Sequence, residues 1–389
     1  AGSGARILIL ERGERLPREA ENWSPEAVFA EQRYRTGETW YDGNGKPFRP
    51  GQFYFVGGHT KVYGTAMFRF RERDFEGIEH ADGKTMPWPV RYTDLEPWYG
   101  EAESLFGVHG RAGDDPTEPP RSTPYPYPPI PHEPIIGQAF ERLRARGLHP
   151  FHMPSAVDLH PGGTCIRCGT CDAFPCKVGA KGDAETRLID PALKHSNVAL
   201  QTGSEVTRLL SDERSKRIVA AEYRHGGKVL TVSAGLFVLS AGAINSAALL
   251  LRSADTRNPQ GLANSSGVVG RYYMNHNCTG LMALTPWRVN STRFPKTLSV
   301  NDFYFASNES DKPLGNLQLL GKIQEPMLRG ALPRTPKWLR TWLARHSVDW
   351  YVMSEDLAQR DSEVRVRNDG AIELRWKRSN LRAHRRFVE

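Results

Sequence analysis

The sequence has no long apolar run, no dispersed set of cysteines and no continuous basic tract. No apolar stretch approaches the ~18 residues that a membrane-spanning helix requires, which excludes a helical membrane span. All but one of the five cysteines lie between Cys165 and Cys176, so the pattern differs from a dispersed disulfide framework. The net charge is +8, but the basic residues are scattered and form no phosphate-binding arm, which argues against a nucleic-acid partner.

The start of the chain carries no basic and apolar leader. We therefore expect any targeting signal to lie upstream of Ala1, and the location stays open between cytoplasm and periplasm. The length of 389 residues is enough for two domains. A hydrophobic share of 39% and a charged share of 25% are typical of a globular protein.

The first glycines imitate a dinucleotide-binding fingerprint without its order. Gly2 and Gly4 precede the apolar run Ile7–Leu10, whereas the fingerprint glycines follow a strand and open a helix. We interpret the run as the second strand of a Rossmann-like unit and expect its phosphate loop upstream. Glu11, at the carboxyl end of this strand, is then placed to bind a ribose hydroxyl, although a surface Glu in a turn is the simpler alternative.

The rest of the chain predicts an α/β protein that is α+β overall. Helical spacing indicates helices at 94–106, with Asp94 as the N-cap, and at 134–146 and 245–251. Strands are predicted at 197–201, 205–210, 218–225, 228–233 and 236–242. Further strands at 298–306, 315–323, 347–353, 363–366 and 372–376 predict a largely antiparallel sheet in a separate lobe. The proline-rich stretch 115–134 predicts an extended crossing between lobes.

Two glycine-containing segments have the character of cofactor loops. The pair Gly57-Gly58, followed by Thr60, Tyr63, Gly64 and Thr65, allows backbone N–H groups to lie against a flat ring system. The second segment is the strand end Ala241-Gly242, which leads into a helix. A plain tight turn is the alternative for the first pair.

Together with the first strand, these segments resemble the glucose-methanol-choline (GMC) oxidoreductase family. The matching stretches are Leu8–Gly13, Gly57–Arg69 and Leu239–Ser246. The resemblance implies an FAD site in which Glu11 holds the ribose, Val206 touches the adenine through its backbone, and the two glycine segments lie near the flavin. Because family members with covalent flavin carry a histidine where this chain has Val62, we expect non-covalent FAD.

The resemblance also implies a division of the chain. Residues 1–110 and 161–277 form the two parts of a Rossmann-like FAD-binding domain, 111–160 form a proline-rich crossing or lid, and 278–389 form an incomplete antiparallel-sheet substrate domain. The family's catalytic histidine is expected beyond Glu389, so no catalytic residue is assigned. Without the phosphate loop, the chain alone is expected to bind FAD weakly.

The cysteine segment has the spacing Cys165-x2-Cys168-x2-Cys171-x4-Cys176. This spacing is close to that of a ferredoxin-type iron–sulfur site but is one residue too long at the last gap. Four thiolates also suit zinc, although zinc sites more often use two separated pairs. Structural thiols or local disulfides are the remaining alternatives.

Three functions stay open from the sequence. The leading one is FAD-dependent oxidation of a CH–OH group of a sugar, glycoside or other alcohol, with an unknown electron acceptor. The second is an electron-transfer protein built on an iron–sulfur or zinc centre at the cysteine segment. The third is a nicotinamide-dependent enzyme, which Glu11 allows but in which the Gly57-Gly58 loop has no role.

Overall fold

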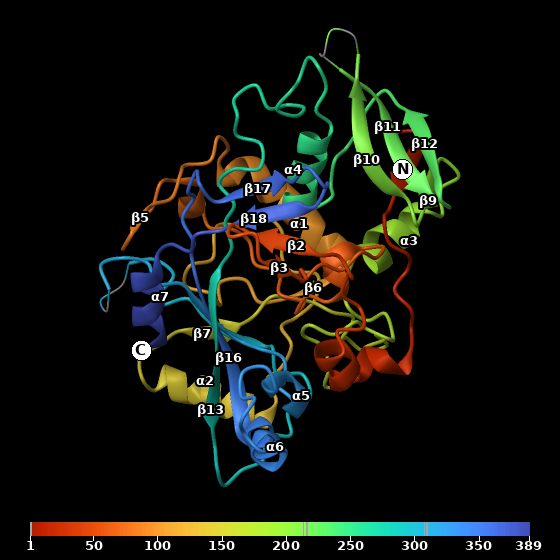
Figure 1. Cartoon of the computed structure of the whole chain (residues 1–389). Coiled ribbons are helices and arrows are strands. Elements are labelled where there is room, and N and C mark those ends of the chain that lie inside the picture. Colours follow the sequence, from red (N-terminus) through yellow and green to blue (C-terminus); the bar gives the residue numbers. More distant parts are fainter. Residues whose placement is uncertain (1, 213, 215–216, 307, 309) are drawn as a thin grey trace.

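The computed structural model describes residues 2–212, 214, 217–306, 308 and 310–389. Figure 1 shows a five-stranded sheet at the bottom, a four-stranded sheet in the middle and a three-stranded sheet at the upper right. The mixture of helices and sheets confirms the expected fold class. Among the described residues, no helix is long and apolar enough to cross a bilayer.

The apolar run near the start forms a parallel strand pair. Strand β1 (Ile7–Leu10) pairs with β9 (Val198–Gln201) in a two-stranded parallel sheet. Both strands match their predicted positions. However, Leu8 is 43% exposed, so β1 is not the fully buried strand that its composition predicts.

A three-stranded antiparallel sheet follows β9 in the chain. It consists of β10 (Glu205–Ser211), β11 (Ile218–His225) and β12 (Lys228–Ser233), as predicted. Gly226 and Gly227 have φ values of 54° and 75° and make the two-residue turn between the last two strands. Two successive left-handed residues are what a type I′ hairpin turn requires, and glycine adopts them without strain.

The five-stranded antiparallel sheet is the centre of the lower lobe. Its strands lie in the order β13 (Asn277–Leu284), β16 (Ser347–Ser354), β15 (Asn316–Leu319), β14 (Leu298–Val300) and β7 (Pro150–His152). Helix α2 (Pro134–Arg144) covers one face, where Ile136 packs against Leu298 and Leu319. The opposite face carries polar side chains. This lobe confirms the predicted antiparallel sheet, with shorter strands.

Two predicted strands of that lobe belong to another sheet. Strands β17 (Glu363–Val366) and β18 (Ile372–Arg375) join β2 (Trp40–Asp42) and β3 (Pro47–Phe48) in the four-stranded sheet. Trp40, Val364 and Ile372 form its core with helix α4 (Ala243–Arg252). Since β7 comes from the predicted crossing and β17–β18 pair with the first part of the chain, the sheets cut across the expected domain boundaries.

Helix α1 (Tyr92–Phe106) corrects one capping prediction. Arg91 is the N-cap, and Asp94 stands three residues later, where its carboxylate accepts the Arg91 backbone N–H at 2.9 Å. Asp94 therefore serves the same helix end from inside the first turn. Helix α6 (Lys337–His346) was not predicted from the sequence. The remaining helices and strands are β4 (Glu79–His80), β5 (Gly83–Lys84), β6 (Val108–His109), β8 (Ser155–Ala156), α3 (Asp190–Ala192), α5 (Glu325–Leu328) and α7 (Leu381–Val388).

The predicted strand at 236–242 is wrong. The segment is irregular, and Leu236 and Val238 are each 80% exposed. No strand among the described residues pairs with it. An apolar sequence becomes a strand only where a neighbour accepts its backbone hydrogen bonds, so composition alone was insufficient here.

Candidate functional site

Four segments that the sequence predicted to face a cofactor converge in space. The Ser204 backbone N–H donates to the Glu11 carbonyl at 2.8 Å, which places the start of β10 beside the end of β1. The Val56 N–H donates to the Glu14 carbonyl at 3.1 Å and brings in the glycine loop. The Asn245 side chain approaches the Tyr54 hydroxyl at 3.4 Å and brings in the start of α4.

The first cofactor segment, 57–65, will be called the glycine loop. Gly57 and Gly58 have φ values of 91° and 54°, in the left-handed region that favours glycine. A short 3₁₀ helix, Gly58–Lys61, follows directly. Thr65 also has a positive φ, 63°, which is unusual for a β-branched residue. Strained backbone of this kind is found where a binding site dictates the conformation.

The side chains of the glycine loop turn inward. The Thr60 hydroxyl donates to the Gly57 carbonyl at 2.5 Å, and the Tyr63 hydroxyl donates to the Gly182 carbonyl at 2.5 Å. Thr65 is fully buried, and its hydroxyl has no hydrogen-bond partner among the described residues.

Segment 181–185 holds the glycine loop in place through ion pairs and a hydrogen bond, which together will be called the ionic lock. The buried Lys61 ammonium lies 3.1 Å from the Asp183 carboxylate and 2.5 Å from that of Glu185. The Ala184 backbone N–H donates to the Thr60 hydroxyl at 3.0 Å. These contacts join two segments about 120 residues apart, which no local sequence pattern could reveal.

Lys181 extends this lock to the cysteine segment. Its ammonium donates to the carbonyls of Tyr63, Cys171 and Phe174 at 2.7, 2.9 and 2.8 Å. Three acceptors match the three N–H donors of an ammonium group. Burial lowers the pKa of Lys181, and the nearby Cys171 and Asp172 counteract that effect.

The ribose and adenine candidates lie together at the end of β1. The Glu11 carboxylate accepts the Gly13 backbone N–H at 2.8 Å. Burial raises the pKa of Glu11, and the backbone N–H groups of Gly13 and Arg12 counteract that effect. Val206 lies at the start of β10 and is partly buried against Leu209 and its neighbours. These positions fit the predicted roles, which stay predictions.

Ala241 and Gly242 lie at the amino terminus of α4. Gly242 is the N-cap with φ 80°, and a side chain there would meet nothing within 4 Å. The first N–H groups of a helix have no intrahelical acceptor, and the helix dipole is positive at this end. This helix end therefore suits a negatively charged or polar part of a cofactor.

The four clustered cysteines line one small cavity. Cys165, Cys168, Cys171 and Cys176 surround it, and its volume is about 20 Å³. All four are free thiols, and burial raises the pKa of Cys171 to about 12. Within the described part of the chain, no three His, Cys, Asp or Glu side chains are arranged to hold a metal ion. The predicted metal role stays a prediction.

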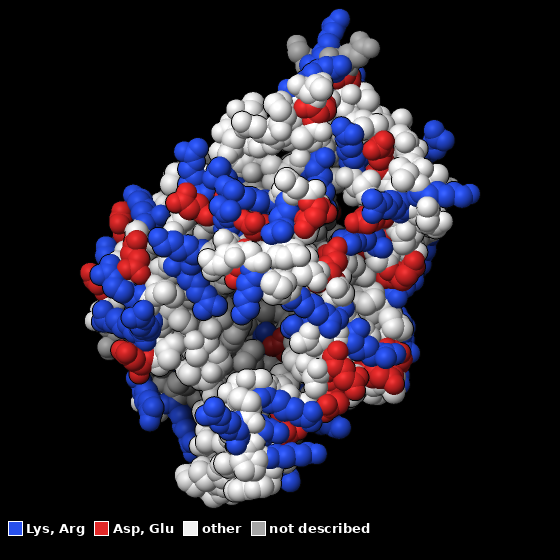
Figure 2. Space-filling view, in the orientation of Figure 1, with Lys and Arg blue, Asp and Glu red and all other residues white. Residues whose placement is uncertain are grey.

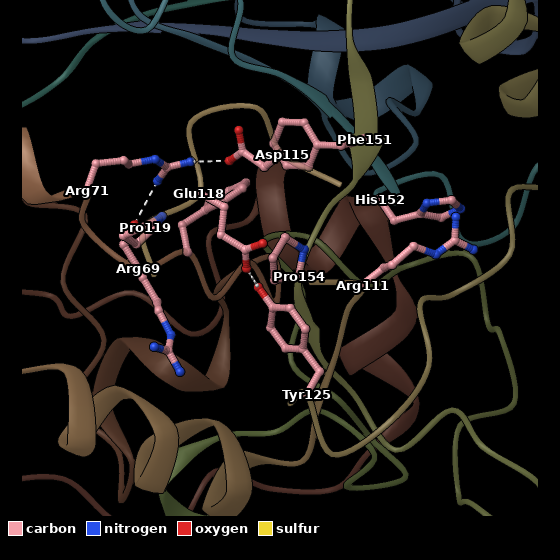
Figure 3. A pocket seen from close by; sticks show the side chains of 11 residues that line it. Arg69, Arg71, Arg111, Asp115, Glu118, Pro119, Tyr125, Phe151, His152 and Pro154 are labelled. Atoms are coloured by element: carbon pink, nitrogen blue, oxygen red, sulfur yellow. Dashed lines mark hydrogen bonds and ion pairs between the residues drawn. The ribbon is translucent and has the colours of Figure 1, made fainter. Parts of the chain in front are cut away.

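A second cavity joins the proline-rich crossing to the lower lobe. It holds about 10 Å³, roughly one water, and is lined by Arg71, Asp115, Glu118, Tyr125 and Phe151 among others. Figure 3 shows Arg71 pointing at Asp115 and Glu118 pointing at Tyr125. The arginines that line it already form ion pairs with nearby carboxylates, so we interpret the cavity as a structural contact, called here the joint, between the crossing and the lower lobe.

From this joint, a chain of hydrogen bonds runs across the polar face of the five-stranded sheet. The Asn301 amide donates to Asp115 at 2.8 Å, and Asn316 donates to the Asn301 amide oxygen at 2.7 Å. Gln318 donates to the Asn316 amide oxygen at 2.9 Å, while its own amide oxygen finds no partner in the part of the chain that the structure describes. The same face approaches the end of the glycine loop, because Phe151 packs on Phe68 with ring centres 6.2 Å apart.

Comparisons with known proteins give the same architecture. The solved structure of pyridoxine 4-oxidase from Mesorbium loti superposes with a TM-score of 0.60 at 16% identity, covering 98% of this chain and 73% of that one. At this identity the likeness shows the fold alone. The model of the GMC oxidoreductase family matches residues 152–278. The chain belongs to the GMC oxidoreductase family.

Two Streptomyces relatives of this GMC chain match over longer stretches. The 6'''-hydroxyparomomycin C oxidase of Streptomyces lividus is 35% identical over 278 residues, 69% of this chain and 49% of the relative. Paromamine 6'-oxidase of Streptomyces fradiae is 31% identical over 327 residues, 80% of this chain and 58% of the relative. The chain thus spans about half the length of these relatives.

FAD is the cofactor of the GMC family, and this chain carries features that fit it. The left-handed Gly57-Gly58 pair, the buried unpaired hydroxyl of Thr65 and the open helix end at Gly242 all lie on the converging segments. The sequence missed the ion pairs of Lys61 with Asp183 and Glu185 and the hydrogen bonds of Lys181 to three backbone carbonyls. Their only local signal was the placement of charged residues in otherwise small-residue stretches.

Proposed function

We propose that the protein oxidises a CH–OH group of a sugar, glycoside or related alcohol with non-covalent FAD. The observation that carries this proposal is the convergence of Glu11, the glycine loop, the start of β10 and the start of α4 on one region. When bound, the flavin accepts a hydride from the substrate carbon. No residue of this chain is assigned to the proton transfer.

The proposed roles of the chain's own residues follow from their positions. Glu11 would hold the ribose through its carboxylate, and the start of β10 at Val206 would contact the adenine. The backbone of the glycine loop would face the flavin ring and stabilise negative charge on it. The helix end at Ala241-Gly242 would contribute N–H donors.

We propose a polyhydroxylated glycoside as the substrate class. The two Streptomyces relatives are named as oxidases of 6'''-hydroxyparomomycin C and of paromamine, which supports a glycoside. The polar face of the lower lobe also supports it, because Gln318 is 3% exposed and keeps an unused acceptor. A buried acceptor without a partner favours a ligand that brings a hydroxyl donor.

The test is anaerobic mixing of the purified full-length protein with glycosides while the visible spectrum is recorded. We expect flavin absorption that bleaches with a sugar or glycoside and recovers with an electron acceptor. Acid precipitation should release the flavin into the supernatant, because the bond is non-covalent. A protein without flavin absorption, or one whose spectrum does not respond to any alcohol, would contradict the proposal.

The cysteine segment carries the second candidate function, an iron–sulfur or zinc centre for electron transfer. It rests on the four thiols that share one cavity. Iron, zinc and acid-labile sulfide measured on the full-length protein test it. Metal in stoichiometric amount supports the candidate, whereas metal-free protein in which Cys165, Cys168, Cys171 and Cys176 are all free thiols contradicts it.

A further inference from the structure

The far end of the lower lobe forms a projecting surface that we call the lobe tip. It consists of residues 284–289, at the end of β13, and helix α6. The Thr285 backbone N–H donates to the His346 carbonyl at 2.8 Å, and the Asn290 N–H donates to the Arg345 carbonyl at 2.8 Å. These bonds fix the loop against the end of the helix. In Figure 1 the lobe tip is the lowest part of the molecule, with α6 beside the turn that follows β13.

The lobe tip exposes large apolar side chains. Trp287 is 87% exposed and Trp338 is 70% exposed, while Leu284 and Val289 are 42% and 45% exposed. Tryptophan is seldom left this open on a protein without a partner, because its large ring loses favourable burial. The exposure therefore indicates a surface that another body covers.

The two segments that carry these side chains have charged residues of one sign, although the neighbouring Glu133 carboxylate accepts the Arg293 backbone N–H at 3.1 Å. Residues 277–301 and 326–348 contain no Asp or Glu, and their charged residues are Arg288, Arg293, Lys296, Arg329, Arg334, Lys337, Arg340 and Arg345. Lys296, Arg329 and Arg340 are paired with carboxylates elsewhere. The other five form no ion pair with any residue that the structure describes and are exposed.

Figure 2 shows how this end differs from the rest of the same face. Over most of the face, basic and acidic side chains are interspersed, whereas uncharged and basic surface dominates the lowest end. A basic surface with protruding aromatic rings complements an anionic layer that has an apolar interior. A nucleic acid would match the charge but has no apolar layer for the tryptophans, and an acidic protein would match both only through an apolar patch of its own.

We propose that the lobe tip docks on an anionic lipid surface. Trp287 and Trp338 enter the boundary between headgroups and acyl chains, where tryptophan is favoured in membrane proteins. Arg288, Arg334 and Lys337 remain in the headgroup layer and attract anionic lipid. The attachment is peripheral and reversible, and it leaves the converging cofactor segments on the upper part of the molecule.

The experiment is co-sedimentation of the full-length protein with vesicles of phosphatidylcholine alone or mixed with phosphatidylglycerol. We expect binding to the mixed vesicles, with about tenfold weaker binding to phosphatidylcholine alone. Raising NaCl from about 0.1 M to about 0.5 M should release the protein, because added salt screens the lipid charge.

Variants separate the lobe tip from the rest of the surface. The double variant Trp287→Ser, Trp338→Ser should lose about tenfold in affinity for the mixed vesicles. Trp98→Ser is the matched control, because Trp98 is 65% exposed on helix α1, outside the lobe tip. Circular dichroism checks that each variant is folded.

Three outcomes would overturn the proposal. The protein could ignore phosphatidylglycerol, or the Trp98 control could lose as much binding as the double variant. The third is a double variant that changes the oligomeric state in size-exclusion chromatography while vesicle binding stays the same, which would make the lobe tip a protein interface. None of these results depends on flavin content, so the proposed oxidase function stands or fails separately.

Discussion

Two segments that the sequence predicted to face the cofactor differ in how the protein holds them. Hydrogen bonds tie the glycine loop, 57–65, to segment 181–185. Lys61 in the loop bonds to the Asp183 carboxylate, the Lys181 ammonium donates to the Tyr63 carbonyl, and the Ala184 backbone N–H donates to the Thr60 hydroxyl. Among the described residues, segment 236–242 has no comparable long-range polar contacts. Its Phe237 and Leu239 pack against the cluster around Leu209 and Leu249, whereas Leu236 and Val238 are 80% exposed. Both were equally plausible as cofactor segments from their glycines. The difference lies in long-range contacts.

The two segments differ in how firmly contacts with other residues hold their backbone. A loop with an unusual backbone persists only when its surroundings hold it in place, and the glycine loop meets that condition. Segment 236–242 places Gly242 at the start of α4 but leaves the preceding strand unformed. The glycine loop is therefore held by polar contacts in one conformation, whereas segment 236–242 is held by its helix end and by the packing of Phe237 and Leu239.

Loss of the Lys61 ammonium should break the support of the glycine loop most strongly. Lys61→Met leaves the buried Asp183 carboxylate without its cation, whereas Glu185 keeps its ion pair with Arg15. Removing one partner of a buried ion pair costs about 3–5 kcal/mol, so we expect this loss in the free energy of unfolding. Chemical denaturation measures it. The exposed Lys194→Met serves as the control, and an equal effect of both variants would mean that the ionic lock is unimportant.

Removal of the Lys181 ammonium should loosen both the glycine loop and the cysteine segment. Lys181→Met leaves three carbonyls without their donor, and we expect a loss of about 2–3 kcal/mol in unfolding free energy. Because burial raises the pKa of Cys171 to about 12, its thiol stays protonated at pH 8 and reacts slowly.

Alkylation of Cys171 with iodoacetamide, followed by mass spectrometry, separates this effect from global unfolding. Removing Lys181 takes away a charge that lowers the pKa of Cys171, which by itself would slow alkylation. We nevertheless expect faster modification of Cys171 in folded Lys181→Met than in the original protein, because the loosened segment gives the reagent access. Unchanged alkylation would show that Lys181 does not hold the cysteine segment. Cys278, which lies in β13 outside that segment, gives an internal reference within each sample.

Alanine at two left-handed glycines compares the two segments directly. In Gly57→Ala, the new Cβ would lie 3.0 Å from the Glu185 backbone nitrogen and 3.1 Å from the Lys61 side chain. In Gly242→Ala, it would meet nothing within 4 Å, so only the backbone strain at φ 80° remains. We expect losses of about 2 kcal/mol and about 1 kcal/mol respectively. Thermal unfolding measures both, and the reverse order would contradict the comparison.

Local patterns were enough to predict much of the fold. Alternation and turn residues located β10, β11 and β12, since a hairpin depends on neighbouring residues and on the Gly226-Gly227 turn. The same patterns could not assign β17 and β18 to their sheet, because β18 pairs with β2, which lies more than 300 residues away in the chain. Strand identity is local, whereas sheet membership is a property of the whole fold.

In the candidate site, too, some residues could be predicted from local sequence and others could not. Glycine pairs signalled the glycine loop because left-handed backbone requires a specific residue type. The lock behind it could not be found, since Lys61 and Glu185 look like ordinary surface residues until the fold buries them. Helix α6 could have been found from the sequence. Trp338 and Trp342, like Leu339 and Leu343, are four residues apart, which is the spacing of an amphipathic helix.

The smallest changes in unfolding free energy are expected at the two exposed side chains of segment 236–242. Leu236→Ser and Val238→Ser remove apolar side chains that the described residues leave 80% exposed. Because little surface is removed from water at either position, each change should alter the unfolding free energy of this chain by less than about 0.5 kcal/mol. Denaturation of the 389-residue chain measures it. The buried Val56→Ser, in the residue that directly precedes the glycine loop, is the contrast and should cost several times more, since Val56 is 1% exposed. Equal losses at Val56 and Val238 would mean that Val238 is packed in solution, and the contrast with the residue before the glycine loop would then disappear.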